Sequence, residues 1–140
     1  MDLSTVLARL KSEVTIIRSI GGAADLASID DGLVATPALF LLPANERASD
    51  MEFAGDTIQH VQASFFVALA VSNEGSAQGE DALGELEPFR NQVKSALLGW
   101  IPIVNHDPVS FVSGSLISFN DATLLWMDEY KTAYYIRSQP

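Results

Sequence analysis

The chain has 140 residues, and 18 Asp and Glu against 8 Lys and Arg give it a formal net charge of −10. Hydrophobic residues make up 48% and charged residues 19%, which is typical of a globular protein and not of a disordered one. Without cysteine the chain has no disulfide, thiolate metal site or cysteine nucleophile. The acidic charge argues against binding to nucleic-acid phosphates or anionic lipid, since both require clustered Lys and Arg.

Neither a targeting segment nor a membrane span is expected. Charged residues interrupt the first twenty positions, and the longest nearly uncharged run, Val61–Asn73, is too short to cross a bilayer as a helix. We therefore expect a single domain over residues 1–140, located by default in the cytosol.

The first segment is predicted to be a helix from Leu3 to Ile17, because its apolar residues recur at spacings of three and four. Asp2 or Ser4 can cap its start, and Gly21-Gly22 can end it. The glycine pair could instead form a phosphate-binding turn. It lacks a preceding strand and a following Lys-Ser/Thr, so we prefer the helix end.

A short helical turn and a loop are predicted for Ala23–Thr36. Asp25, Asp30 and Asp31 could together hold a divalent metal. A solvated acidic loop is the preferred interpretation, because no second cluster has matching spacing.

Two strands are predicted next. Pro37–Leu42 is a continuous apolar run between two prolines, typical of a strand buried on both faces, and Ala44–Asp56 is expected to be a mobile loop. In Thr57–Ser72 apolar and more polar residues alternate strictly, which is typical of a strand. Every second residue from Val61 to Val71 lies on an apolar face, and every second residue from His60 to Ser72 lies on a face that is more exposed to water. Phe66 breaks the wetter face, which would suit a subunit contact.

A second helix is predicted for Glu80–Leu98, after a loop at Asn73–Gly79. Pro88 lies inside it, so the helix either kinks there or restarts, and Gly99 ends it. Trp100–Pro108 is expected to be an extended connection.

The C-terminal part is predicted to be a meander of three strands, Val109–Val112, Gly114–Phe119 and Thr123–Arg137. Ser113-Gly114 and Asn120-Asp121 would be its turns. The last strand is long enough that it must bend or project from the domain. The fold class is therefore α+β: a mostly antiparallel sheet of four to five strands with two amphipathic helices packed on one face.

Candidate catalytic groups are few. His106 next to Asp107 could suggest a Ser-His-Asp arrangement, but adjacent residues rarely orient one another and no Gly-x-Ser-x-Gly motif exists. Asp128 falls on the aromatic face of the last strand and needs a cationic partner: Arg90, Lys94 or an arginine of a neighbouring subunit. We interpret Asp128 as half of a structural ion pair and the aromatic residues as core or interface, and we expect no enzyme.

Several elements in one order resemble the tail-terminator (tail-completion) proteins of long-tailed bacteriophages, in particular those of Mu-like prophages. Leu97-Leu98-Gly99-Trp100 and the stretch from Trp126 to Tyr130 are the most specific. The other matching pieces are Arg18–Leu26, Pro37–Pro43 with Glu46-Arg47, the strand to Asn73, and Tyr134–Arg137.

The resemblance implies a small α+β subunit of a homo-hexameric ring on the head-proximal end of the tail tube. Such a ring stops polymerisation of the tube protein and offers a surface to the head-completion or connector protein. The resemblance also implies a structural role in the virion and assembly in the host cytoplasm. It implies no catalytic residue, no cofactor, no metal and no membrane contact. DNA would pass through the lumen without specific binding.

On this basis we predict subunit-interface residues and residues that face the tube or lumen. The first set is Arg47, Phe66, Trp126, Asp128, Tyr130 and Tyr134, and the second is Glu74, Glu80 and Asp81. Two alternatives stay open: another head–tail connector or tube-capping ring component, and a small metal-dependent enzyme that uses the Asp25 cluster.

Overall fold

The computed structural model describes residues 1–27, 29, 34–50, 52–53, 57–72, 80–119 and 123–138; side chains are described within these ranges except at residues 52, 53, 57, 80, 81 and 138. The elements follow in the order α1 (Ser4–Glu13), β1 (Ser19–Gly21), α2 (Ala23–Leu26), β2 (Ala38–Ala48), β3 (Glu52–Phe53), β4 (Thr57–Ser72), α3 (Glu80–Leu97), β5 (Ser110–Phe119) and β6 (Thr123–Ser138).

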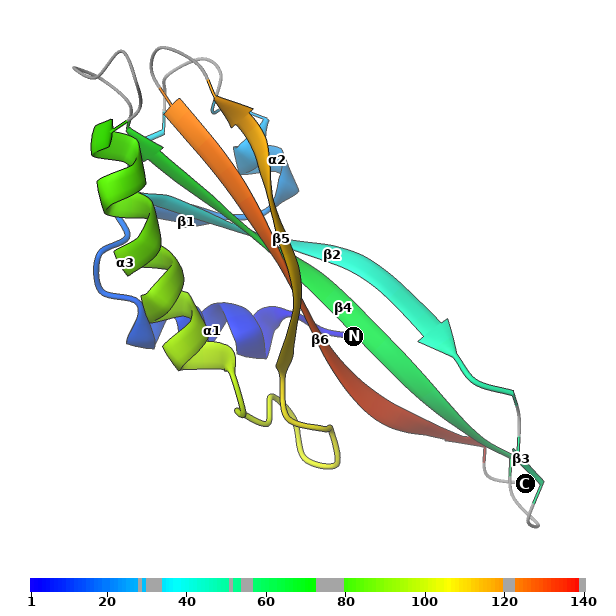
Figure 1. Ribbon diagram of the computed structural model, residues 1–140. Helices are drawn as coiled ribbons and strands as arrows, with labels where there is room; N and C mark the ends of the chain where they lie inside the picture. Colours follow the sequence, from blue (N-terminus) through cyan, green and yellow to red (C-terminus); the bar gives the residue numbers. More distant parts are fainter. Residues whose placement is uncertain are drawn as a thin grey trace.

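One sheet organises these elements (Figure 1). Its strands lie in the order β1-β2-β4-β6-β5, and β3 pairs with the first residues of β4. All neighbours are antiparallel except β1 and β2, which are parallel. The predicted α+β class is thus confirmed, with one short parallel strand added at an edge.

The main core lies between the sheet and helices α1 and α3, which cover the same face (Figure 1). Apolar residues at alternate positions of β4, from Phe65 to Val71, meet Leu10 of α1 and Phe89 of α3 there, and all of these side chains are buried. The predicted alternation of β4 is confirmed on this face.

A smaller core lies on the opposite face, where Leu26 of α2, Ile29 and Val34 pack on the sheet. Ala68 and Ala70 of β4 are fully buried there with Phe40 of β2, against Leu26 and Val34. The face of β4 that was predicted to be more exposed to water is therefore exposed only in the first half of the strand, because α2 covers the second half of the strand.

Helix α1 ends at Glu13, four residues before the predicted end. The next four residues, Val14 to Ile17, are all β-branched, and such side chains lose rotamer freedom in a helix. Val14 is already extended and buried, and the Thr15 N–H is bound by Gln92 Oε1 at 3.0 Å. Gly21 lies in β1 and Gly22 precedes α2, so the glycine pair does not end α1.

Strand β2 continues six residues past its predicted end at Leu42. Its first four residues are buried as predicted, and the register shifts between Pro43 and Asn45. Because β1 pairs only as far as Phe40, Pro43 lies where β2 is the edge strand of the described sheet, a position at which proline is tolerated. The predicted loop at Ala44–Asp56 thus contains the end of β2 and also β3.

Strand β5 is one strand, so the turn predicted at Ser113-Gly114 is wrong. The register with β6 shifts between Phe111 and Ser113 instead, which is a bulge that keeps the chain extended. The turn predicted at Asn120-Asp121 and the loop at Asn73–Gly79 lie outside the described residues.

Helix α3 matches its prediction to within one residue. The helix continues through Pro88 as a single helix, so it does not restart there. It is followed by Gly99 with a φ of 77°, the left-handed conformation that glycine adopts at little cost. No helix in the described part of the chain is long and apolar enough to cross a membrane.

The last strand, β6, was predicted to bend or to project from the domain because of its length, and it projects. Strands β4 and β6 pair over 16 positions, and their ends beyond the helices form, with the end of β2 and with β3, an arm that carries the C-terminus (Figure 1). We use "arm" below for residues 43–48 of β2, 57–63 of β4 and 132–138 of β6, together with β3.

Candidate interaction surfaces

A buried ion pair joins β6 to α3. Arg90 Nε and Nη2 donate to the two carboxylate oxygens of Asp128, each at 3.0 Å, and the indole N–H of Trp126 donates to Asp128 Oδ1 at 2.8 Å. The Arg90 guanidinium also lies 4.7 Å from the centre of the Trp126 ring. Asp128 is fully buried, and its hydrogen bonds raise the pKa of Arg90. Among the three predicted partners of Asp128, the structure selects Arg90.

Gly114 of β5 lies directly over this ion pair. It pairs with Asp128 in the sheet, and a Cβ atom at this position would overlap the Asp128 carboxylate and lie 3.1 Å from Trp126 Cζ2. Glycine is therefore required by the close approach of the β5 backbone.

We expect Gly114→Ala to lower the free energy of unfolding by about 2 kcal/mol, because overpacking forces buried groups out of place. Urea unfolding followed by circular dichroism measures the change. Ser115→Ala is the matched control on the same strand, and a loss of less than about 0.5 kcal/mol is expected for such an exposed site. Equal stability of the two variants would contradict the close contact.

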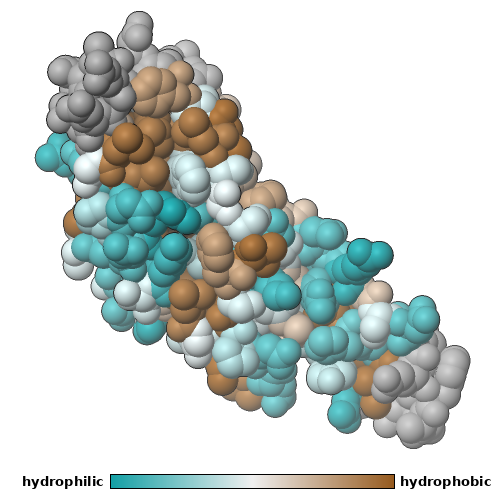
Figure 2. All heavy atoms as spheres, in the orientation of Figure 1, coloured by the Kyte–Doolittle hydropathy of each residue, from teal (hydrophilic) through white to brown (hydrophobic). Residues whose placement is uncertain are grey.

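An apolar surface extends along β5 and the start of α3. All ten residues of β5 are exposed, the strand lies at the sheet edge, and it contains no charged residue and no proline. Figure 2 shows hydrophobic side chains gathered over the upper part of β5 and the adjoining end of α3. We call this set the β5 surface; it comprises Leu83, Phe111, Val112, Leu116, Ile117 and Phe119, which are 37–57% exposed.

An edge strand of this kind is a surface that other chains can pair with. In the described part of the chain no strand pairs with its outer N–H and C=O groups, and natural proteins usually protect such edges with charged residues or proline. The only such protection in β5 is its two register shifts, between Phe111 and Ser113 and between Leu116 and Ser118. An exposed apolar patch on an uncovered edge is typical of a protein interaction site.

The arm carries the second group of exposed residues. Arg47 lies on the face without α1 and α3, in a shallow cleft of about 240 Å³ that Gln62, Glu129 and Lys131 also line. On the other face, Tyr134 donates to Glu46 Oε1 at 3.2 Å, and Glu46 also binds the N-terminal ammonium of Met1. This ammonium holds the pKa of Glu46 below its usual value.

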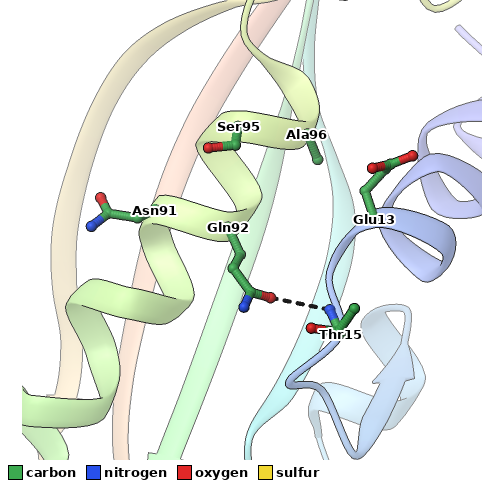
Figure 3. Close-up of a pocket in the computed structure, with 6 residues that line it drawn as sticks. All are labelled: Glu13, Thr15, Asn91, Gln92, Ser95 and Ala96. Atoms are coloured by element: carbon green, nitrogen blue, oxygen red, sulfur yellow. Dashed lines mark hydrogen bonds between the residues drawn. The ribbon is translucent and has the colours of Figure 1, made fainter.

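The cleft between the end of α1 and α3 has a structural explanation. It measures about 350 Å³ and is lined by Glu13, Thr15, Asn91, Gln92, Ser95 and Ala96 (Figure 3). Gln92 points across it and accepts the Thr15 N–H, which fixes the chain where α1 gives way to extended backbone (Figure 3). The remaining lining groups present no cationic or nucleophilic cluster.

The predicted catalytic and metal candidates do not assemble in the described part of the chain. His106 stacks on Tyr134 with ring centres 4.8 Å apart, and burial lowers its pKa. Asp107 lies instead 3.9 Å from Nε2 of His60. No group of three metal-ligating side chains occurs among the described residues, and Asp30 and Asp31 lie outside them.

The predicted interface residues divide between core and surface. Asp128 and Tyr130 are fully buried within the chain, which argues against their predicted place at an interface. Phe66, Trp126 and Tyr134 are half-buried and Arg47 is exposed, so these four retain surface for a neighbour. Glu74 lies outside the described residues, as do the side chains of Glu80 and Asp81 at the start of α3.

The apolar edge at β5 was missed from the sequence, although its signal was present. Ser110–Phe119 is a long run without charge or proline, which marks an edge strand that is not protected. The turn predicted at Ser113-Gly114 divided this run and hid it. The contact of Glu46 with the N-terminus has no sequence signal, because it depends on how α1 packs beside β2.

The described surfaces include an apolar open edge at one end and a projecting arm at the other, and an exposed apolar edge of this kind is typical of proteins that bind other chains. The model of the phage tail terminator protein family matches the chain over residues 1–140, and the chain therefore belongs to this family. It is a structural component of the virion tail and interacts with other tail or head components. A search of curated proteins gave no match.

Proposed function

We propose that this chain caps the head-proximal end of the phage tail tube as a ring of six copies. The ring stops polymerisation of the tube protein and presents a surface to the head-completion protein. The observation that carries the proposal is the match to the tail terminator family over the whole chain. Assembly takes place in the host cytoplasm, before the tail joins the head.

The β5 surface is the proposed contact with the tube. A tube grows because each ring of subunits offers the next ring a complementary surface, and a cap must occupy that surface. Leu116 and Phe119 face the helix side of the sheet at an open edge and are about half-exposed. Burial of the exposed half of each side chain gives roughly 0.7–1.5 kcal/mol, and six copies repeat the contact.

The distribution of charge supports a lumen that DNA passes without binding. Seven of the 18 acids but only one of the 8 Lys and Arg lie in the parts of the sequence that connect helices and strands, so these connections carry six of the ten excess negative charges. The ends of β4 and β5 and the start of β6 adjoin one another in the sheet. We propose that Glu74, from the connection between β4 and α3, and Glu80 and Asp81, at the start of α3, face the tube or lumen, where negative charge repels the DNA backbone.

The test is tube growth in the presence of the protein. Tube subunits are polymerised with and without it, and tube lengths and ends are measured by electron microscopy. Short tubes with a ring at one end are expected. Normal elongation would contradict termination, and rings that bind the head connector but not the tube would favour the alternative of a connector component.

A further inference from the structure

A groove at the edge of the sheet is unused by the surfaces described above. It measures about 420 Å³ and lies where α1 begins beside β1 and β2. Leu3, Leu7 and Leu41, which are buried or half-buried, give it an apolar base. Asp2 and Asp25 are exposed residues of its lining, so the groove combines apolar contact with two carboxylates.

Both carboxylates are fixed in place by backbone groups. Asp2 Oδ1 accepts the N–H of Ser4 at 2.9 Å, which keeps the pKa of Asp2 below its usual value, and Asp25 Oδ2 accepts the N–H of Gly22 at 3.0 Å. Among the described residues no Lys or Arg lies within ion-pair distance of either. The groove thus suits an extended segment that has apolar side chains and a cation.

The end of the arm has this composition. Tyr135 and Ile136 are 60% and 48% exposed, and Arg137 is exposed beside them, with no carboxylate within ion-pair distance in the described part of the chain. Its charge and its apolar residues complement those of the groove.

The arm end and the groove of one chain cannot meet. Leu41 lies opposite Val67 of β4 and Arg137 lies opposite Ile58, and nine residues of strand separate these positions by about 30 Å. Any contact between the two surfaces must therefore join two copies. Because the surfaces differ, the contact is head-to-tail, the type that generates rings.

We propose that the arm end of one copy, at Tyr135, Ile136 and Arg137, docks in the groove of the next copy, with Arg137 paired to Asp2 or Asp25. The proposal rests on the proposed ring and names the surfaces that join its subunits. It leaves the β5 surface free for the tube.

Cysteine cross-linking tests the contact directly, because the chain contains no cysteine of its own. Ser4→Cys places a thiol in the groove with little change of volume, and Ile136→Cys places one on the exposed arm end. A disulfide requires Cα atoms within about 7 Å, so this pair can bond only between copies. After mild oxidation, with and without the tube subunit, we expect a ladder of linked oligomers on a non-reducing gel.

The matched control combines Ile136→Cys with Ser95→Cys, an exposed serine on α3 away from the groove. It should stay largely monomeric on the same gel, as should each single variant. A ladder from the control as strong as that from the test pair, or rings by light scattering without a ladder from the test pair, would overturn the docking and leave the terminator function standing.

Charge exchange gives an independent readout. Arg137→Glu and Asp2→Lys should each lower the yield of rings at least tenfold, and the double variant should recover most of it. Failure to recover both in this double variant and in Arg137→Glu with Asp25→Lys, with all variants folded by circular dichroism, would count against the pairing. A wild-type chain that stays monomeric even with growing tubes would overturn both this contact and the proposed ring.

Discussion

Asp128→Ala is expected to lower the free energy of unfolding by about 3 kcal/mol, the largest stability effect predicted for a polar residue of this chain. The substitution leaves Arg90, whose side chain is 13% exposed, without its bidentate partner, and it leaves the Trp126 N–H without an acceptor. Breaking a buried ion pair on one side costs more than the pair contributes, because the remaining charge stays desolvated. Thermal unfolding should show a decrease in Tm of roughly 10 °C.

The control for this prediction removes the other partner of the same arginine. Glu87 Oε1 lies 3.0 Å from Arg90 Nη1, but the Glu87 side chain is 62% exposed, so water screens the interaction. Glu87→Ala should therefore cost less than about 1 kcal/mol. Similar losses for the two variants would show that Asp128 is not the dominant partner.

The second large effect concerns assembly. The double substitution Leu116→Lys and Phe119→Lys on the β5 surface should abolish tube termination while the fold is retained. Both side chains are about half-exposed, so the unfolding free energy should change by less than about 1 kcal/mol. The two lysines place charges on the apolar face that the proposed contact buries, and burial of an unpaired charge is strongly unfavourable. Electron microscopy should show tubes as long as those without the protein.

A matched double variant separates charge from position. Ser113 and Ser115 pair with Glu129 and Met127 on the opposite face of the same strand. Ser113→Lys with Ser115→Lys adds the same charge there, and short tubes are expected to persist. Loss of termination in both variants would indicate a general effect of charge on β5, and retention in both would remove β5 from the proposed contact.

The sequence predicted the parts of the fold that depend on local patterns. The alternation of Thr57–Ser72 and the helical spacing of Glu80–Leu97 each bury a continuous apolar face, so the pattern and the packing agree. The errors arose where a local signal was overridden. Pro43 reads as a strand end unless the strand lies on an open edge, and Ser113-Gly114 reads as a turn unless the glycine is needed for close packing on Asp128.

The candidate surfaces were less predictable than the fold. Asp128 could be assigned to an ion pair because a lone acid on an aromatic face requires a cation, but a choice among Arg90, Lys94 and a neighbour needs the packing of α3 on β6. The groove beside β1 brings together Asp2, Asp25 and Leu41 from three separate segments. No sequence spacing encodes such a meeting, so only the fold reveals it.

The uninterrupted pairing of β4 and β6 has a mechanical consequence. Their register runs without a shift through all 16 positions, whereas the flanking strands β2 and β5 both contain shifts. The β4–β6 ladder therefore runs from the body of the sheet into the arm without a bulge. If the arm joins neighbouring copies, the angle between two copies is set by the twist of β4 and β6. The number of subunits at which a ring closes would then be a property of the β4–β6 ladder.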